Sequence, residues 1–170
     1  MKPLTFNLVN LPKTRTIGMR WEGTWKEINS LRRVIRKMAQ RVDELDGALS
    51  PKEHIGLSYH DKNNGFVHYS VFAVDENQTV PEGMIEWMIP ESFYVHVTHP
   101  KNESIGNTYN ALYEWILKSK YQLKLASDIK YYDPLPVKYE IYERGLPISR
   151  SKTEIYIPID LKGDTLGVVF

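Results

Sequence analysis

The chain has 170 residues, a formal net charge of +1 at pH 7 and no cysteine. This length allows one domain with a full-sized core, and the near-neutral charge argues against generic nucleic-acid binding, which usually shows a strong basic excess. The lack of cysteine excludes disulfides, thiolate catalysis and thiolate metal sites. No stretch has the pattern of a signal peptide or of a membrane span. We therefore expect a cytoplasmic protein.

The first part of the chain begins with strands and a helix. Short strands are predicted at residues 6–9 and 16–21. Thr24 and Glu27 have the spacing of a capping box, and apolar residues then recur at helical intervals. We therefore expect a helix over residues 25–45.

The polar side of this predicted helix is basic. Such a stripe indicates either a solvated helix face or a surface that docks an acidic protein partner, and the sequence leaves both open. The residues concerned are Lys26, Arg33, Arg36, Lys37 and Arg41.

A hairpin follows the helix. Its strands are predicted at residues 54–60 and 66–75, joined by an Asp-Lys-Asn-Asn-Gly turn at 61–65. Residues 80–90 read as a connector of the kind that covers a pocket. Trp87, inside it, suits either a pocket or the core.

The second part of the chain repeats this order of elements. A strand is predicted at residues 93–98 and a helix at 105–121. Two further strands, 138–143 and 151–159, are separated by an Arg-Gly-Leu-Pro turn at 144–147.

Two such units predict an α+β fold made of two βαββ repeats related by a pseudo-twofold axis. Both helices would lie on one face of a joint antiparallel sheet, and the opposite face would form a ligand cleft. We expect residues 1–170 to form a single domain, with halves at roughly 14–76 and 91–159.

An acidic residue in the middle of the last strand needs an explanation. With a period of two, Ile155 and Ile157 point to one face, and Glu154 and Tyr156 point to the other. Glu154 either faces water on a half-solvated sheet or lies on the floor of an aromatic cavity, where a carboxylate is costly unless a cation meets it.

Three stretches carry a family resemblance: IEWMIPESFYV at 85–95, YEW at 113–115 and TEIYIPI at 153–159. Together with the order of elements, they resemble the GyrI-like effector-binding domain, a bacterial module of multidrug-responsive transcription activators that also occurs as a stand-alone protein. The resemblance implies an aromatic cleft in which a glutamate of the last strand contacts cationic, often aromatic, ligands. Glu154 occupies the matching position.

Other side chains could line that cleft with Glu154. Each of them could also serve the core or face solvent, and the sequence does not decide between these roles. Rings at several of the positions would make a cation–π cage. The candidates are Tyr156, Tyr94, His96, Tyr69, Trp87, Tyr59 and Tyr142.

Three functions remain open from the sequence. The leading one is a stand-alone protein that binds an amphipathic, cationic aromatic molecule for sequestration or signalling. The first alternative, implied by the resemblance, is a metal-free hydrolase of reactive cyclopropane-type molecules in which Glu154 activates water. The second is a protein-interaction module, such as a gyrase inhibitor, that works through the basic helix face.

We expect no cofactor, no metal and no direct contact with DNA. His96 and His99 are three residues apart in an extended segment, so they point to opposite faces, and no metal-binding or phosphate-binding motif accompanies them. The stretch before Thr16 is too short for a DNA-binding domain like that of the regulators.

Overall fold

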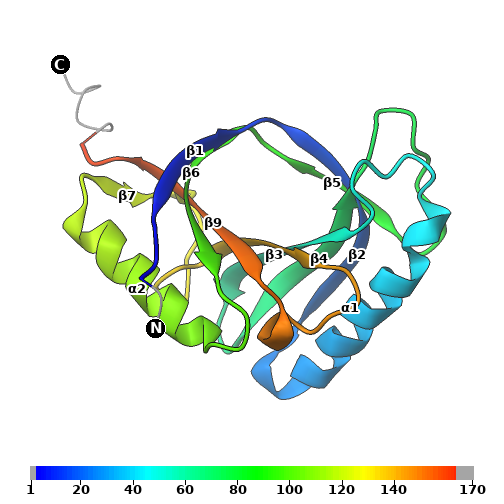
Figure 1. Ribbon diagram of the computed structural model, residues 1–170, viewed down its shortest axis with the longest axis horizontal. Helices are drawn as coiled ribbons and strands as arrows, with labels where there is room; N and C mark the ends of the chain where they lie inside the picture. The colour runs from blue at the N-terminus through cyan, green and yellow to red at the C-terminus, as the bar shows by residue number, and fades with distance from the viewer. Residues whose placement is uncertain (1–2, 164–170) are drawn as a thin grey trace.

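Two amphipathic helices and one curled antiparallel sheet make up residues 3–163, the part of the chain that the computed structural model describes (Figure 1). The elements in chain order are β1 (Asn7–Leu11), β2 (Thr14–Thr24), the 3-10 turn η1 (Trp25–Glu27), α1 (Ile28–Arg41), η2 (Val42–Glu44), β3 (Glu53–Lys62), β4 (Gly65–Ala73), β5 (Ile85–Ile89), β6 (Ser92–His99), α2 (Ile105–Lys118), β7 (Tyr121–Leu123), β8 (Val137–Glu143), η3 (Ile148–Arg150) and β9 (Thr153–Leu161).

The sheet is symmetric about its centre. Its strand order is β1-β6-β9-β8-β3-β4-β2-β5, with β7 paired to β9. From the centre outward, β3, β4 and β2 of the first half follow the same order as β8, β9 and β6 of the second half. The predicted α+β fold of two βαββ repeats is therefore confirmed, with the pseudo-twofold axis between β3 and β8.

The edge strands are exchanged between the halves. β1 precedes β2 in the chain but pairs with β6, whereas β5 precedes β6 but pairs with β2. Each half thus covers an edge of the other half and satisfies its backbone hydrogen bonds. The sheet curls into a half-barrel with both helices outside it (Figure 1). We call the helix-covered side of the sheet the outer face and the enclosed side the inner face.

The predicted capping box begins the first helical segment. The Thr24 backbone N–H donates to Glu27 Oε1 at 3.0 Å, and the helical turns then run through η1, α1 and η2. Leu31 packs in one cluster with Trp21 and Phe66 on the outer face. The apolar stripe of the sequence is therefore the stripe that covers the sheet.

The second helix covers the other half of the outer face. Leu112 and Ile116 of α2 lie in one buried cluster with Val97, Ile155 and Ile157 of the sheet. This confirms the predicted helix-facing side of β9. Among the helices of residues 3–163, none is long and apolar enough to cross a membrane.

Two sequence predictions of local structure are wrong. The predicted connector contains β5, because the edge of β2 offers backbone groups that a pairing strand satisfies whatever its side-chain pattern. Trp87 therefore lies in a sheet strand and not in a lid. The second helix ends at Lys118 rather than at residue 121, since the Ser119 hydroxyl accepts the Tyr121 backbone N–H at 3.0 Å and Tyr121 opens β7.

Candidate functional site

The inner face carries two groups of three aromatic rings. Tyr69 and Trp87 stack with their ring centroids 4.1 Å apart, and Tyr59 meets them edge-on at 5.9 and 6.0 Å. We call these three residues the first ring group. They come from β3, β4 and β5, and the curl of the sheet brings their strands together.

The second ring group consists of Tyr94, Tyr139 and Tyr156, whose centroids are 5.2 to 6.0 Å apart. These residues come from β6, β8 and β9. Both ring groups belong to one apolar cluster that also contains Leu57 and Val71. One apolar cluster that contains both ring groups thus joins the two halves on the inner face.

Glu154 lies at the rim of the second ring group. Its carboxylate accepts a hydrogen bond from His96 Nε2 at 2.5 Å and from the Thr98 hydroxyl at 2.8 Å. The Asn7 side-chain amide nitrogen lies 3.3 Å from the other ring nitrogen of His96. The nearest lysine nitrogen, on the exposed Lys152, is 4.0 Å away. Hydrogen bonds from His96 and Thr98 therefore hold the carboxylate in position.

The tyrosine rings around this carboxylate stay neutral. Burial raises the pKa of Tyr94 to about 12, and it also raises the pKa of Tyr139. Burial, followed by the negative charge of Glu154, raises the pKa of Tyr156. Neutral rings present the negative faces that attract cations. One ring already does so, because the Arg20 guanidinium lies 5.9 Å from the centroid of Tyr69.

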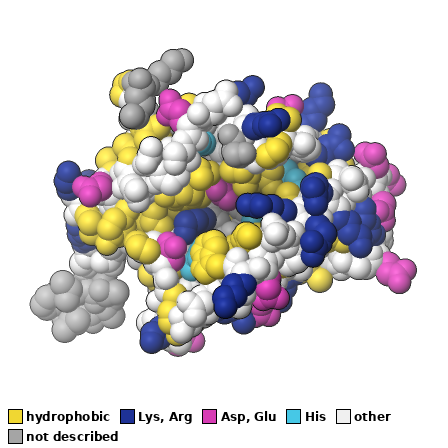
Figure 2. Space-filling model, turned by 90° about the horizontal axis from the view of Figure 1, so that it is seen from below, with side chains coloured by type: hydrophobic (Ala, Val, Ile, Leu, Met, Phe, Trp, Pro, Cys, Tyr) yellow, Lys and Arg dark blue, Asp and Glu magenta, His cyan; other side chains and the backbone are white. Residues whose placement is uncertain are grey.

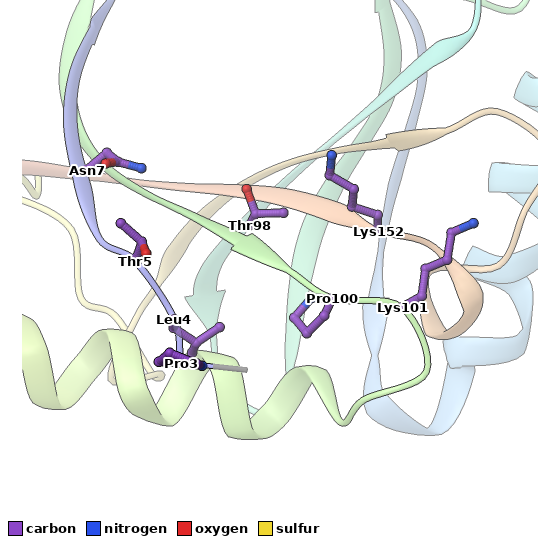
Figure 3. A pocket seen from close by; sticks show the side chains of 8 residues that line it. All are labelled: Pro3, Leu4, Thr5, Asn7, Thr98, Pro100, Lys101 and Lys152. Carbon is purple, nitrogen blue, oxygen red and sulfur yellow. The ribbon is translucent and has the colours of Figure 1, made fainter. Parts of the chain in front are cut away.

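A cavity of about 440 Å³ adjoins this rim. Thr98, which donates to Glu154, lines the cavity together with Asn7 and Lys152 (Figure 3). Figure 3 also shows Leu4 on the chain segment beside α2. The cavity is an open space into which a ligand group next to Glu154 could extend.

The structure brings seven of the eight predicted site residues to the inner face and its rim, and it does not bring Tyr142 there. Tyr142 points to the outer face, where its ring stacks on His54 with centroids 5.1 Å apart. Its β8 neighbour Tyr139 takes the inner position, opposite Tyr156. Sequence reasoning missed Tyr139, although a period of two along residues 138–143 places it on the face opposite Tyr142.

One protein-family model and one curated protein match most of this chain. The Cass2 family model, described as integron-associated effector binding protein, matches residues 7–159. The transcriptional regulator BrlR of Pseudomonas aeruginosa is 26% identical to this chain over 154 residues. That match covers 89% of this chain and 54% of the regulator, so the chain spans about half the length of this relative.

Solved structures share the fold. The C-terminal domain of EcmrR superimposes with a TM-score of 0.65 at 20% identity, covering 93% of this chain and 98% of that domain. SAV2435 bound to tetraphenylphosphonium superimposes with a TM-score of 0.62 at 12% identity, covering 92% of this chain and 94% of that one.

Proposed function

The chain belongs to the integron-associated effector binding protein family, related to the ligand-binding domains of transcription regulators, and on this premise we propose that it binds a small amphipathic cation carrying aromatic rings. The ligand would lie on the inner face, with Glu154 as its counter-ion. One observation carries the proposal: a carboxylate that accepts hydrogen bonds from His96 and Thr98 lies at the rim of a group of three neutral tyrosine rings, Tyr94, Tyr139 and Tyr156. SAV2435 supports the ligand class, since tetraphenylphosphonium is an aromatic cation.

A cationic ligand gains free energy from two parts of the site, the aromatic rings and the Glu154 carboxylate. A cation over a ring face gains about 0.5–2 kcal/mol for each well-placed ring. The Glu154 carboxylate adds a Coulombic attraction that a partly buried position, with 28% of the side chain exposed, screens less than bulk water does. An aromatic anion would meet the same rings but would be repelled by Glu154. The site should therefore select ligands by charge sign.

Binding would serve either to sequester the ligand or to report it to a partner protein. The basic stripe of α1 is the surface on which such a partner would dock. Arg41 donates to Glu44 at 2.5 and 2.8 Å and to the Glu82 carbonyl at 2.8 Å, so part of its charge is used within the chain. The four other basic residues of the stripe are exposed: Lys26, Arg33, Arg36 and Lys37.

The contact between His96 and Glu154 favours a second candidate, hydrolysis of a strained ring. Water would attack a ring carbon, and Glu154 would take a proton from that water as the ring bond breaks. Glu154 would then return this proton to the released carbon, while its hydrogen bond with His96 holds the carboxyl group in place. The product would be the substrate plus one water, which mass spectrometry would detect. Loss of turnover in Glu154→Gln would support the enzyme, and an unchanged ligand after prolonged incubation would support simple binding.

Thermal shift with tetraphenylphosphonium and tetraphenylborate tests the binding proposal, because the two ions have similar shapes and opposite charges. A ligand at about 100 times its Kd stabilises by about 2.7 kcal/mol, which is roughly 5–10 °C for a chain of this size. We expect the phosphonium to raise the Tm of the wild type and to lose most of this effect in Glu154→Gln. Asp160→Asn, on the same strand, is the matched control and should respond like the wild type. Equal shifts by both ions would contradict the proposal.

A further inference from the structure

A second cavity lies on the outer face, between the two helices. Its volume is about 710 Å³, within the range of small-molecule sites. Leu31 and Ile35 of α1 form one wall, Ile105 at the start of α2 forms another, and Leu146 and Ile148 after β8 form a third. Figure 2, which views the helix side, shows a hollow edged by hydrophobic side chains with Lys and Arg beside it. The sheet separates this cavity from the ring groups of the inner face.

Two residues that line this cavity each carry a buried polar atom without a hydrogen-bond partner in the described part of the chain. They are His54 Nδ1 and the Tyr142 hydroxyl, and both residues line the cavity. His54 is 0% exposed and Tyr142 is 3% exposed. Unpaired buried polar groups are costly, so most proteins pair them. Two such groups on residues that line one cavity point to a ligand that pairs them.

The contact of His54 with Ser70 is compatible with a donor at His54 Nδ1. His54 Nε2 is 2.6 Å from Ser70 Oγ. If the Ser70 hydroxyl donates to Nε2, both groups are satisfied and the imidazole proton remains on Nδ1. Burial, with a smaller effect of the Arg144 charge, lowers the pKa of His54 to about 4, so the ring is neutral at pH 7. Nδ1–H and the Tyr142 O–H are then two donors on residues that line the cavity.

The charges around the cavity favour a negative ligand group. Arg32 and Arg36 of α1 line the cavity, and Glu103 is the one acidic residue among the described residues that line it. Arg144 adds positive charge near His54. Two neutral donors and a positive excess suit an oxygen acceptor that carries negative charge.

We propose that the cavity between the helices is a second ligand site, which binds an amphipathic carboxylate. A carboxylate oxygen accepts hydrogen bonds from the Tyr142 hydroxyl and His54 Nδ1–H, while the apolar body of the ligand packs on Leu31 and Ile35 of α1. This site is independent of the cation site, because the two lie on opposite faces of the sheet.

Decanoate, decan-1-ol and decyltrimethylammonium test this assignment by calorimetry on the full chain. We expect decanoate to bind with one site per chain, the alcohol to bind more weakly, and the ammonium to bind least. Amide shifts in NMR spectra should change in α1 and at the end of β8. Equal binding of all three compounds, or shifts confined to the inner-face strands, would overturn the proposal.

Matched variants locate the contacts. Tyr142→Phe should weaken decanoate binding by about tenfold, the effect of losing one hydrogen bond to a charged group. Arg36→Ala should weaken it, whereas Arg33→Ala, which removes an exposed arginine outside the cavity lining, should not. Ala39→Phe should block the cavity. Wild-type affinity in both Tyr142→Phe and Arg36→Ala would refute the site. Glu154→Gln should still bind decanoate. A failure of the cation site can therefore be distinguished from a failure of the outer cavity site.

Discussion

Two tyrosine hydroxyls on the outer face should respond in opposite ways to the same substitution. The Tyr142 hydroxyl has no hydrogen-bond partner within residues 3–163, whereas the Tyr109 hydroxyl donates to Glu140 at 2.7 Å. Replacing either tyrosine with phenylalanine removes one oxygen and preserves the ring packing. The difference between the two variants therefore isolates the hydrogen bond.

The expected change in stability depends on whether the removed hydroxyl has a hydrogen-bond partner. An unpaired buried hydroxyl costs about 1–3 kcal/mol, so Tyr142→Phe should be neutral or should stabilise the ligand-free protein by about 1 kcal/mol. That gain corresponds to a Tm rise of roughly 2–4 °C. Tyr109→Phe leaves the buried Glu140 carboxyl, 8% exposed, without this donor, and should cost about 1.5–3 kcal/mol.

Urea unfolding followed by circular dichroism measures both variants under one set of conditions. The midpoint for Tyr142→Phe should be at or above that of the wild type, and the midpoint for Tyr109→Phe should be clearly below it, with similar m-values. Equal destabilisation by both substitutions would mean that Tyr142 has a partner. The argument for a ligand in the outer cavity would then fail.

Two further predictions concern stability. Burial lowers the folded-state pKa of His54 to about 4 and of His68 to about 3, below the ordinary 6.5. The unfolded chain therefore binds more protons below pH 6.5. The contribution of these two histidines to stability should be constant above that pH and should fall by up to about 1.4 kcal/mol per pH unit per histidine as the pH drops toward 4. Urea midpoints at pH 7 and pH 5 check this, and equal midpoints would contradict it. Leu112 is 0% exposed, so Leu112→Ala should lower the free energy of unfolding by about 2–5 kcal/mol. Leu117, on the same helix, is 56% exposed, so Leu117→Ala should change it by less than about 0.5 kcal/mol. Similar losses in both variants would show that α2 does not pack as described.

Local patterns in the sequence were enough to predict the helices and the face of the last strand. The capping box of Thr24 and Glu27 predicts the start of a helix, and the alternation of Glu154 with Ile155 predicts which side of the strand each faces. Two such units in the same order also predicted the symmetric sheet. These predictions succeed because periodicity and capping depend on neighbouring residues.

Features that depend on pairing between strands far apart in the sequence could not be predicted. The exchange of β1 and β5 between the halves is set by which edges remain open after folding, and no local pattern records it. The register of β8 decides that Tyr139 faces inward and Tyr142 outward, and a shift by one residue would reverse both. The outer cavity arises where α1, the start of α2 and the segment after β8 meet, so it has no signature within a single element.

The position of a bound aromatic cation tests the central proposal most directly. We would measure intermolecular NOEs between the phenyl protons of tetraphenylphosphonium and the tyrosine rings of the protein. Binding on the inner face predicts NOEs to Tyr94, Tyr139 and Tyr156 and none to Tyr142, which lies on the other side of the sheet. NOEs to Tyr142 or to α1 side chains, with none to the inner rings, would contradict the inner-face site and the role of Glu154 as counter-ion.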